Sequence, residues 1–285
     1  MLGECLDYLA LRPDGIFLDA TAGLGGHSGA IAARLTSGFV IANDRDAESL
    51  DQARANTIEK LGSQANRIRY HQGSFTDLKS ALTESGVQQV DGLLADLGVS
   101  RYQLTDPARG FSLMADGPLD MRMDRSRGST AAELVNFTSE KELADLIFQL
   151  GEERRSRKIA RAIVRARPIS TTGRLAHAIE EAVPRTTRLH PATQTFMALR
   201  LAVNDEQGEL DGLLEAAPDL VKTGGRIVIL SFMSLEDRKV KQSFQALARA
   251  RRATLLTKHV VRPTAEETRD NPPSRSAKLR AVEMR

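Results

Sequence analysis

A short glycine-rich turn near the N-terminus constrains the fold of this chain more than any other feature. Residues 16–29 read IFLDATAGLGGHSG, so that apolar residues are followed by small residues and glycines, and a helical pattern follows at 31–35. This order predicts a strand, a tight turn and a helix, an arrangement in which backbone N–H groups approach a ligand closely. We therefore expect a binding crevice at the end of the first strand of an α/β protein.

Strand-like segments alternate with helical ones on both sides of a long helical stretch. The expected strands are 15–21, 39–43, 67–71, 90–97, 226–232, 253–261 and 278–283, and a helix is expected at 46–60. Such alternation is typical of a mainly parallel sheet with helices on both faces. From 105 to 205 only helical patterns occur. The prediction is an α/β core made from residues 1–104 and 206–285, with a helical insertion at 105–205.

Composition places the chain among ordinary globular proteins, with 41% hydrophobic and 27% charged residues in 285. A single cysteine, Cys5, excludes an internal disulfide, and no His/Cys/Asp/Glu spacing suggests a metal site. The sequence shows no leader and no apolar run long enough to span a bilayer. We expect a cytoplasmic protein without a membrane partner, either a monomer or a homodimer.

The glycine turn departs from the fingerprint of dinucleotide-binding proteins. Gly23 and Gly25 match the first two positions of G-x-G-x-x-G, but Ser28 occupies the third. Asp19 also ends the strand, and its charge would repel an anion about 4 Å away by about 4 kcal/mol at an effective dielectric constant near 20. A cationic ligand reverses the sign of that interaction. The turn therefore favours S-adenosylmethionine, which carries a sulfonium and an ammonium, over a pyrophosphate-containing cofactor.

The end of the second strand supplies a candidate for binding ribose. Asp44 lies about 20 residues beyond the glycines, where an acid commonly accepts hydrogen bonds from ribose hydroxyls. Such an acid serves a nicotinamide cofactor and S-adenosylmethionine equally well. The alternative is that Asp44 caps the next helix.

Four further stretches carry a resemblance to one family. They are LLADLGVSRYQL (93–104), RGFSLMADGPLDMRMD (109–124), HPATQTF (190–196) and SLEDRKVK (234–241). Together they resemble the RsmH (MraW) methyltransferases, which methylate N4 of a cytidine in the decoding region of bacterial small-subunit ribosomal RNA. The similarity runs from about residue 4 to the C-terminus. It implies a class I (Rossmann-like) methyltransferase sheet with a helical insertion, and a partner that is small-subunit ribosomal RNA or a 30S-type particle.

The resemblance also implies a set of contacts to S-adenosylmethionine. By motif they come from Gly25, Gly26, His27, Asp44, Phe75, Asp96 and Gln103. Phe75 would stack on adenine unless it belongs to the core. Asp96 would accept from an amino group or the ammonium unless it caps the next segment, and Gln103 would hydrogen-bond in the crevice unless it lies on the surface.

The chain departs from the family pattern at two places beside these motifs. Met233 stands where the family usually has a histidine before SLED, and the usual SSPQLD reads SRYQLTD, which introduces Arg101 and Tyr102. No catalytic role can therefore be assigned through that histidine.

The chemistry at N4 calls for an acceptor beside the amine. The lone pair of the N4 amine is delocalised into the cytosine ring. The enzyme therefore has to orient the extruded base and accept an N–H proton. The candidate acids are Asp96 and Asp120, although Asp120 could instead fix its loop. Amino-directed methyltransferases often carry an Asp/Asn-Pro-Pro-Tyr-like segment after the fourth strand. NPPS occurs here at 271–274, before the last strand, and is interpreted as a turn.

The insertion contains a strongly basic helical segment, EERRSRKIARAIVRAR at 152–167. At 100° per residue, four cations fall on a stripe about 60° wide, namely Arg154, Lys158, Arg161 and Arg165. Ile159 and Ile163 lie opposite, toward a core. RNA phosphates would relieve the repulsion within the stripe and make binding salt-dependent. The alternative is a solvated face balanced by nearby acids.

Other functions stay open at this point. One is a methyltransferase of the same fold with a small-molecule or protein substrate, and another is a non-catalytic RNA-binding assembly factor. A nicotinamide-dependent oxidoreductase is disfavoured by Ser28 and Asp19.

Overall fold

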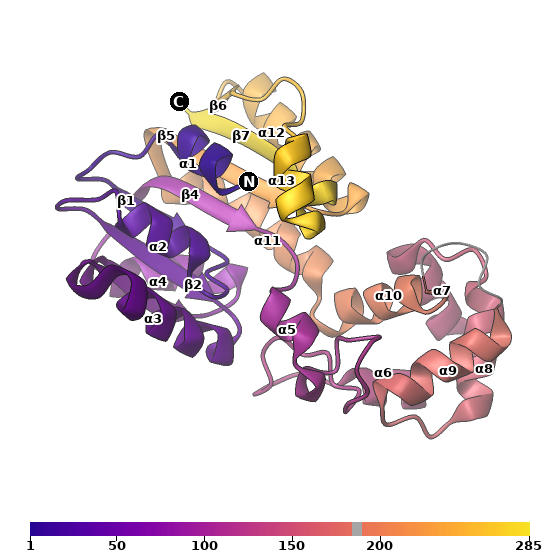
Figure 1. Cartoon of the computed structure of the whole chain (residues 1–285). Coiled ribbons are helices and arrows are strands. Elements are labelled where there is room, and N and C mark those ends of the chain that lie inside the picture. The colour runs from indigo at the N-terminus through magenta and orange to yellow at the C-terminus, as the bar shows by residue number, and fades with distance from the viewer. Residues whose placement is uncertain (184–189) are drawn as a thin grey trace. The chain divides into compact units, whose positions relative to one another are not determined.

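The computed structural model describes residues 1–183 and 190–285 and divides the chain into two compact units (Figure 1). Unit 1 consists of residues 1–98 and 207–285, and unit 2 of residues 99–206. The chain therefore leaves unit 1 once and returns to it once. Each unit has a hydrophobic core of its own.

Unit 1 is built on a seven-stranded sheet with the order β3-β2-β1-β4-β5-β7-β6. Its strands are β1 (Ile16–Asp19), β2 (Phe39–Asp44), β3 (Ile68–Gln72), β4 (Val90–Asp96), β5 (Val221–Ser231), β6 (Ala253–Leu255) and β7 (Lys278–Met284). The first five pair in parallel, and β7 runs antiparallel to β5 and β6. The predicted α/β class with a mainly parallel sheet is confirmed.

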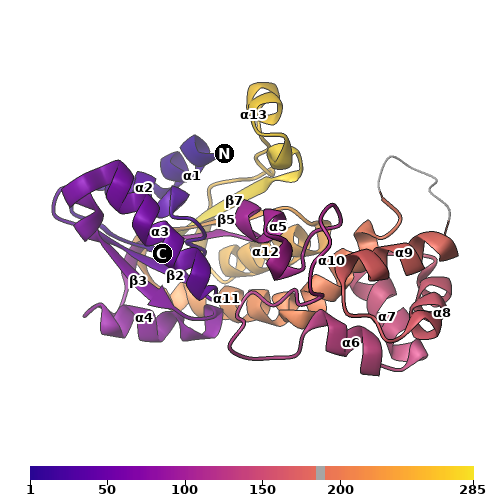
Figure 2. The same cartoon turned by 60° about the horizontal axis from the view of Figure 1, so that its bottom comes forward.

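Helices cover both faces of this sheet. One face packs against α1 (Leu2–Leu9), α2 (Gly26–Ala32) and α3 (Ala47–Leu61), and the other against α4 (Leu78–Glu84), α11 (Glu206–Leu220) and α12 (Ser234–Arg249). Figure 2 shows α2 and α3 on the opposite side of the strands from α4 and α11. The side chains of successive strand residues pack into the cores on the two faces of the sheet, as those of Leu93 and Leu94 in β4 do. Because both faces are buried, the strands are almost entirely apolar.

Two strand boundaries differ from the prediction by more than two residues. The strand expected at 253–261 ends at Leu255, because the N–H groups of Leu256 and Thr257 both point to the carbonyl of Ala281 and the chain leaves the ladder. Pairing resumes only as an isolated bridge between Val261 and Leu279. By contrast, β5 begins five residues before the expected position, with a register shift in its pairing to β4. The remaining short elements of unit 1 are η1 (Gly62–Arg67), η2 (Phe75–Asp77), α13 (Ala265–Asp270) and η4 (Pro272–Ser276).

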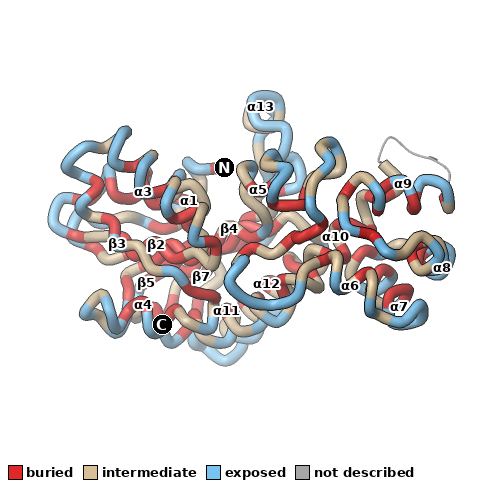
Figure 3. Tube along the Cα trace, turned by 90° about the horizontal axis from the view of Figure 1, so that it is seen from below, coloured by how far each residue is buried: buried red, intermediate tan, exposed pale blue. Residues whose placement is uncertain are grey.

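Unit 2 is helical, and the part of it that the structure describes contains no strand longer than a single bridge. Its elements are α5 (Arg101–Thr105), η3 (Pro107–Arg109), α6 (Ala131–Phe137), α7 (Glu140–Gly151), α8 (Ser156–Ala166), α9 (Thr172–Ala182) and α10 (Thr193–Val203). Buried inner faces and exposed outer faces alternate along α7 and α8 (Figure 3). The predicted burial of Ile159 and Ile163 is confirmed. Arg154 precedes the first residue of α8, so it does not share the helical stripe that the sequence predicted.

The stretch 109–124 is a tightly packed loop within unit 2. Arg109 is almost fully buried and donates to the carbonyls of Arg122 and Met123 at 3.1 and 3.0 Å. Gly117 is required because a Cβ there would lie 2.0 Å from the carbonyl oxygen of Pro107. Asn204 of the segment after α10 accepts from the N–H of Met123 at 2.7 Å. The unusual sequence of this motif is therefore explained largely by the packing of the loop.

Candidate functional site

Three carboxylates lie at the carboxyl ends of neighbouring parallel strands in unit 1. Asp19 ends β1, Asp44 ends β2 and Asp96 ends β4. The strand order reverses direction between β1 and β4. Ligands of open α/β sheets bind in the crevice at such a reversal, outside the carboxyl ends of the strands. This edge is the candidate site.

Asp19 is enclosed behind the turn and does not face a ligand. Its side chain is fully buried and accepts from the hydroxyl of Ser28 at 2.6 Å and from the N–H of Thr21 at 3.2 Å. Burial raises the pKa of this carboxyl. The expectation that Asp19 places its charge directly in the crevice is therefore wrong. The serine at the third fingerprint position is the hydrogen-bond partner of this acid.

Asp44 holds the glycine turn from the neighbouring strand. Its two oxygens accept from the N–H of Gly23 at 2.7 Å and from the N–H of Asp46 at 2.9 Å. The cap of α3 is Asp46, whose Oδ1 accepts from the N–H groups of Glu48 and Ser49. Asp44 is thus not the helix cap considered as the alternative. Burial raises its pKa to about 6.

The turn packs closely against α3. Gly25 has a φ of 85° and is the N-cap of α2, and a Cβ there would lie 2.9 Å from Cγ2 of Thr57. A side chain at this position would therefore be strained in conformation and would push the turn away from α3. Gly26 follows as the first residue of α2, and space is open above it.

Asp96 and His27 form the most exposed pair at this edge. Their Oδ2 and Nδ1 atoms lie 3.6 Å apart, and the side chains are 32% and 17% exposed. The hydroxyl of Thr21 accepts from the Asp96 N–H at 2.6 Å and fixes the end of β4. Burial raises the pKa of Asp96, and the charge of Asp19 adds to that rise, while His27 opposes it. The other oxygen, Oδ1, is buried and has no hydrogen-bond partner within the described residues.

A cavity of about 340 Å³ opens beside this pair. It is lined by Gly26, His27 and Asp96 together with Phe232, Asn271 and Pro273. The NPPS segment, interpreted from sequence as a turn, forms the start of η4 and contributes to this wall. Asn271 donates from Nδ2 to Oε1 of Glu267 at 3.0 Å. Sequence reasoning missed this contribution, although the Asn-Pro-Pro order was the available signal.

Comparisons with known proteins identify the family. The model of the MraW methylase family matches residues 1–285. The chain belongs to the MraW methylase family. "Ribosomal RNA small subunit methyltransferase H" of Solibacter usitatus (strain Ellin6076) is 64% identical over 285 residues, which cover all of this chain and 98% of the relative. The protein of the same name from Acidobacterium capsulatum is 48% identical and covers all of this chain and 97% of the relative.

Solved structures are more distant from this member of the MraW family. The crystal structure of an rRNA methylase from Streptococcus thermophilus covers 98% of this chain and 92% of its own, with 13% identity and a TM-score of 0.46. A likeness at that level carries no argument about the site. The family assignment rests on the family model and on the sequence relatives.

Three residues predicted for the site of this MraW-family chain have structural partners of their own. Phe75 is half-buried against the core beneath α4 and α11, and its N–H donates to Glu209 at 2.9 Å. Gln103 belongs to unit 2, where its Oε1 accepts from the N–H of Ser100 at 2.9 Å and completes the capping box of α5. The structure therefore gives Gln103 a local structural partner.

Asp120 also belongs to unit 2 and forms a bidentate ion pair with Arg122. The distances are 2.7 Å from Nε to Oδ1 and 3.0 Å from Nη2 to Oδ2. Although burial opposes ionisation, the hydrogen bonds and charge of Arg122 lower the pKa of Asp120. A carboxylate held in this way is a weak proton acceptor, which favours the loop-fixing role.

Met233, which replaces the family's usual histidine, lies at the N-cap of α12. The N–H groups of Phe232 and Met233 both donate to Oε2 of the buried Glu236, each at 3.0 Å. Phe111 and Phe196 are buried in the core of unit 2.

Among residues 1–183 and 190–285, no group of three or more His, Cys, Asp or Glu side chains could hold a metal ion. Over the same residues, no helix is both long and apolar enough to cross a membrane.

Proposed function

We propose that this chain is an S-adenosylmethionine-dependent methyltransferase that modifies N4 of a cytidine in the decoding region of small-subunit ribosomal RNA. Family membership and the printed names of the close relatives support a methylase that acts on this RNA. The single observation that carries the proposal is the buried Oδ1 of Asp96 at the edge of the sheet, which has no hydrogen-bond partner among residues 1–183 and 190–285. A buried acceptor without a donor is unfavourable until a ligand supplies one.

The residues present fit the proposed cofactor. The pKa of Asp44 and Asp96 is raised in each case chiefly by burial, so a ligand with positive charge at this edge would stabilise their ionised forms. In this proposal Asp44 would accept from ribose hydroxyls, and Asp96 from an ammonium or amino group. The open space above Gly26 leaves its backbone accessible beside His27.

S-adenosylmethionine, when bound, supplies a methyl group on a sulfonium. The chain has to present the N4 amine of the cytidine in line with that methyl group and accept a proton from it. Asp96 is the candidate acceptor for an N4–H proton, because its raised pKa makes it a stronger base than an exposed carboxylate. His27, 3.6 Å away, would stabilise the ionised form of that acid. The roles predicted for Phe75, Gln103 and Asp120 stay predictions, and the ion pair of Asp120 weighs against catalysis there.

The partner in this proposal is small-subunit ribosomal RNA, free or within a 30S-type particle, in the cytoplasm. Unit 1 would bind the cofactor and unit 2 would recognise RNA. This division assigns a function to each of the two compact units.

The decisive experiment uses purified protein, small-subunit RNA or subunits, and cofactor labelled in its methyl group. We expect label in RNA that nuclease digestion and mass spectrometry identify as N4-methylcytidine. Label found only in a protein or small molecule would favour the alternative substrate classes. Cofactor and RNA binding without any transfer would favour an assembly factor.

A further inference from the structure

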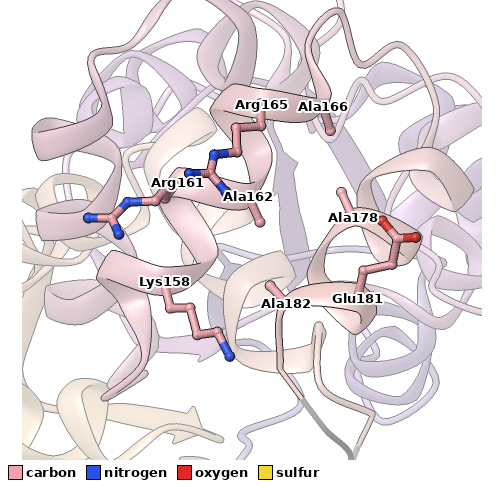
Figure 4. Close-up of a pocket in the computed structure, with 8 residues that line it drawn as sticks. All are labelled: Lys158, Arg161, Ala162, Arg165, Ala166, Ala178, Glu181 and Ala182. Carbon is pink, nitrogen blue, oxygen red and sulfur yellow. The ribbon is translucent and has the colours of Figure 1, made fainter.

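Helices α8 and α9 of unit 2 enclose a charged groove, which we name the α8/α9 groove. It has a volume of about 500 Å³ and is lined by Lys158, Arg161, Ala162, Arg165 and Ala166 of α8 and by Ala178, Glu181 and Ala182 of α9. Figure 4 shows the three cations on one wall and the glutamate on the other. No residue of unit 1 contributes to its lining.

The three cations recur at helical spacing on one face of α8. Lys158 and Arg161 are three residues apart, and Arg161 and Arg165 are four apart, so neighbouring charges repel each other. All three side chains are exposed. Arg161 lies 3.4 Å from Glu140, an exposed pair of little energetic value. Within the part of the chain that the structure describes, Lys158 and Arg165 form no ion pair.

The floor of the groove consists of alanines, which lets a ligand approach the helix backbones closely. Among the described residues, Glu181 is the only acid that lines it, and its Oε1 lies 3.4 Å from Nε2 of His177. The lining therefore has an excess of positive charge that its own acid does not balance. Lys158 and Arg165 are seven residues apart, so the cations extend about 10.5 Å along the helix axis. An extended polyanion matches this arrangement better than a single small anion does.

We propose that the α8/α9 groove binds the sugar-phosphate backbone of the RNA substrate. This inference rests on the proposed function and deepens it, because it locates a substrate contact on one face of unit 2. Phosphates relieve the repulsion among Lys158, Arg161 and Arg165, and their counterions are released on binding. Among the described residues no aromatic side chain lines the groove, so it offers no platform on which bases stack, and its cations are suited to phosphates.

Binding without the methyl donor tests this proposal separately from catalysis. The probe is a fluorescently labelled transcript of decoding-region RNA, titrated by anisotropy at salt concentrations from about 50 to about 200 mM. Each neutralised phosphate contributes roughly 0.7 to 0.9 to the slope of log K against log salt. The combined variant Lys158→Gln, Arg161→Gln and Arg165→Gln is expected to lower that slope by about 2 to 3 and to weaken binding at low salt at least about tenfold.

Two further variants make the result specific to the groove. Lys141→Gln removes an exposed cation of α7 outside the groove and should leave the slope unchanged. Glu181→Gln removes the opposing acid and should tighten RNA binding, an effect that a purely structural role would not produce. Thermal unfolding of each variant should match the parent, since these side chains are exposed.

A slope in the triple variant equal to that of the parent would overturn the proposal. So would displacement of the RNA by polyglutamate at equal charge concentration, because the groove would then suit an acidic protein surface. Failure of methyl transfer with an intact salt slope would instead contradict the proposed function and leave the groove assignment standing.

Discussion

Asp96 combines the features expected of the central acid of the site. It ends β4 beside the reversal of strand order, lies 3.6 Å from His27 and keeps one buried oxygen without a partner. The same strand carries a second acid at its opposite end. Asp91 accepts from the N–H of Ile16 at 2.8 Å and forms an ion pair with Lys222 at 3.1 Å. Variants of these two aspartates therefore allow the proposed catalytic role of Asp96 to be tested separately from an effect on stability.

Asp96→Asn is expected to lower kcat for methyl transfer roughly 10²- to 10⁴-fold, because the amide cannot accept the N4 proton. The fold should persist, since the replacement has the same shape. Asp91→Asn is the matched control and should retain kcat while lowering the free energy of unfolding. Single-turnover methyl transfer and urea denaturation measure the two effects. Equal loss of kcat in both variants would contradict the role of Asp96.

Cofactor binding is expected to depend on pH through Asp44, whose pKa is raised to about 6. Affinity should be constant above that pKa and weaken below it, approaching tenfold per pH unit, as the acceptor of ribose hydroxyls is protonated. The stability effect has the opposite sign. Because the folded pKa exceeds the ordinary value of 3.8 for an aspartate, protonation relieves the cost of burying the charge, and this contribution to stability rises as pH falls through about 6.

Calorimetric titration of the cofactor across this pH range measures the first effect. Asp44→Asn should bind more weakly and lose the inflection near pH 6. An inflection that survives in Asp44→Asn would assign the titration to another group.

At the scale of elements, the sequence predicted which segments are strands and helices better than where they end. The sheet followed from the alternation of apolar runs with amphipathic segments, and the helical insertion from its lack of such runs. The end of β6 was missed because it depends on the carbonyl of Ala281, far away in the chain. Arg154 was placed on α8 because a pattern of cations continues beyond the helix that begins at Ser156.

The sequence predicted those parts of the candidate site that consecutive residues form. It missed the parts that residues distant in the chain contribute. The glycine turn, Asp44 and Asp96 come from strand ends that chain order identifies. Asn271 and Pro273 reach the same cavity from a segment before the last strand, so that their Asn-Pro-Pro order does not by itself show that they lie beside Asp96. Gln103 follows Asp96 closely in sequence, yet the chain enters unit 2 at Val99.

The loop at 109–124 supports a prediction about stability. Asn204 is buried, accepts from the N–H of Met123 and donates to the carbonyls of Met121 and Arg200. Asn204→Ala removes the side-chain partner of the Met123 N–H and of the Met121 carbonyl, while the Arg200 carbonyl keeps the backbone N–H of residue 204, and it is expected to lower the free energy of unfolding by about 2–3 kcal/mol. The exposed Asn66→Ala should change it by less than about 0.5 kcal/mol. Urea denaturation measures both, and similar values for the two variants would contradict this role.

At the scale of the whole molecule, we expect the cofactor to stabilise unit 1 more than unit 2. The residues proposed to hold the cofactor belong to unit 1. At a cofactor concentration of about 100 Kd, unit 1 should gain about 2.7 kcal/mol against unfolding. Hydrogen exchange read by mass spectrometry should show this protection in the strands β1, β2 and β4, with little change in α7 and α8. Equal protection in both sets of elements would show that the units unfold together.

The insertion of unit 2 between β4 and β5 has a consequence for synthesis of the chain. When residue 98 leaves the ribosome, β3, β2, β1 and β4 can pair, but the edge of β4 that later binds β5 is open. It stays open until residues 221–231 emerge, more than a hundred residues later. Open strand edges invite pairing with other chains. The nascent protein therefore passes through a period of vulnerability to aggregation during which unit 2, continuous in sequence, can already fold.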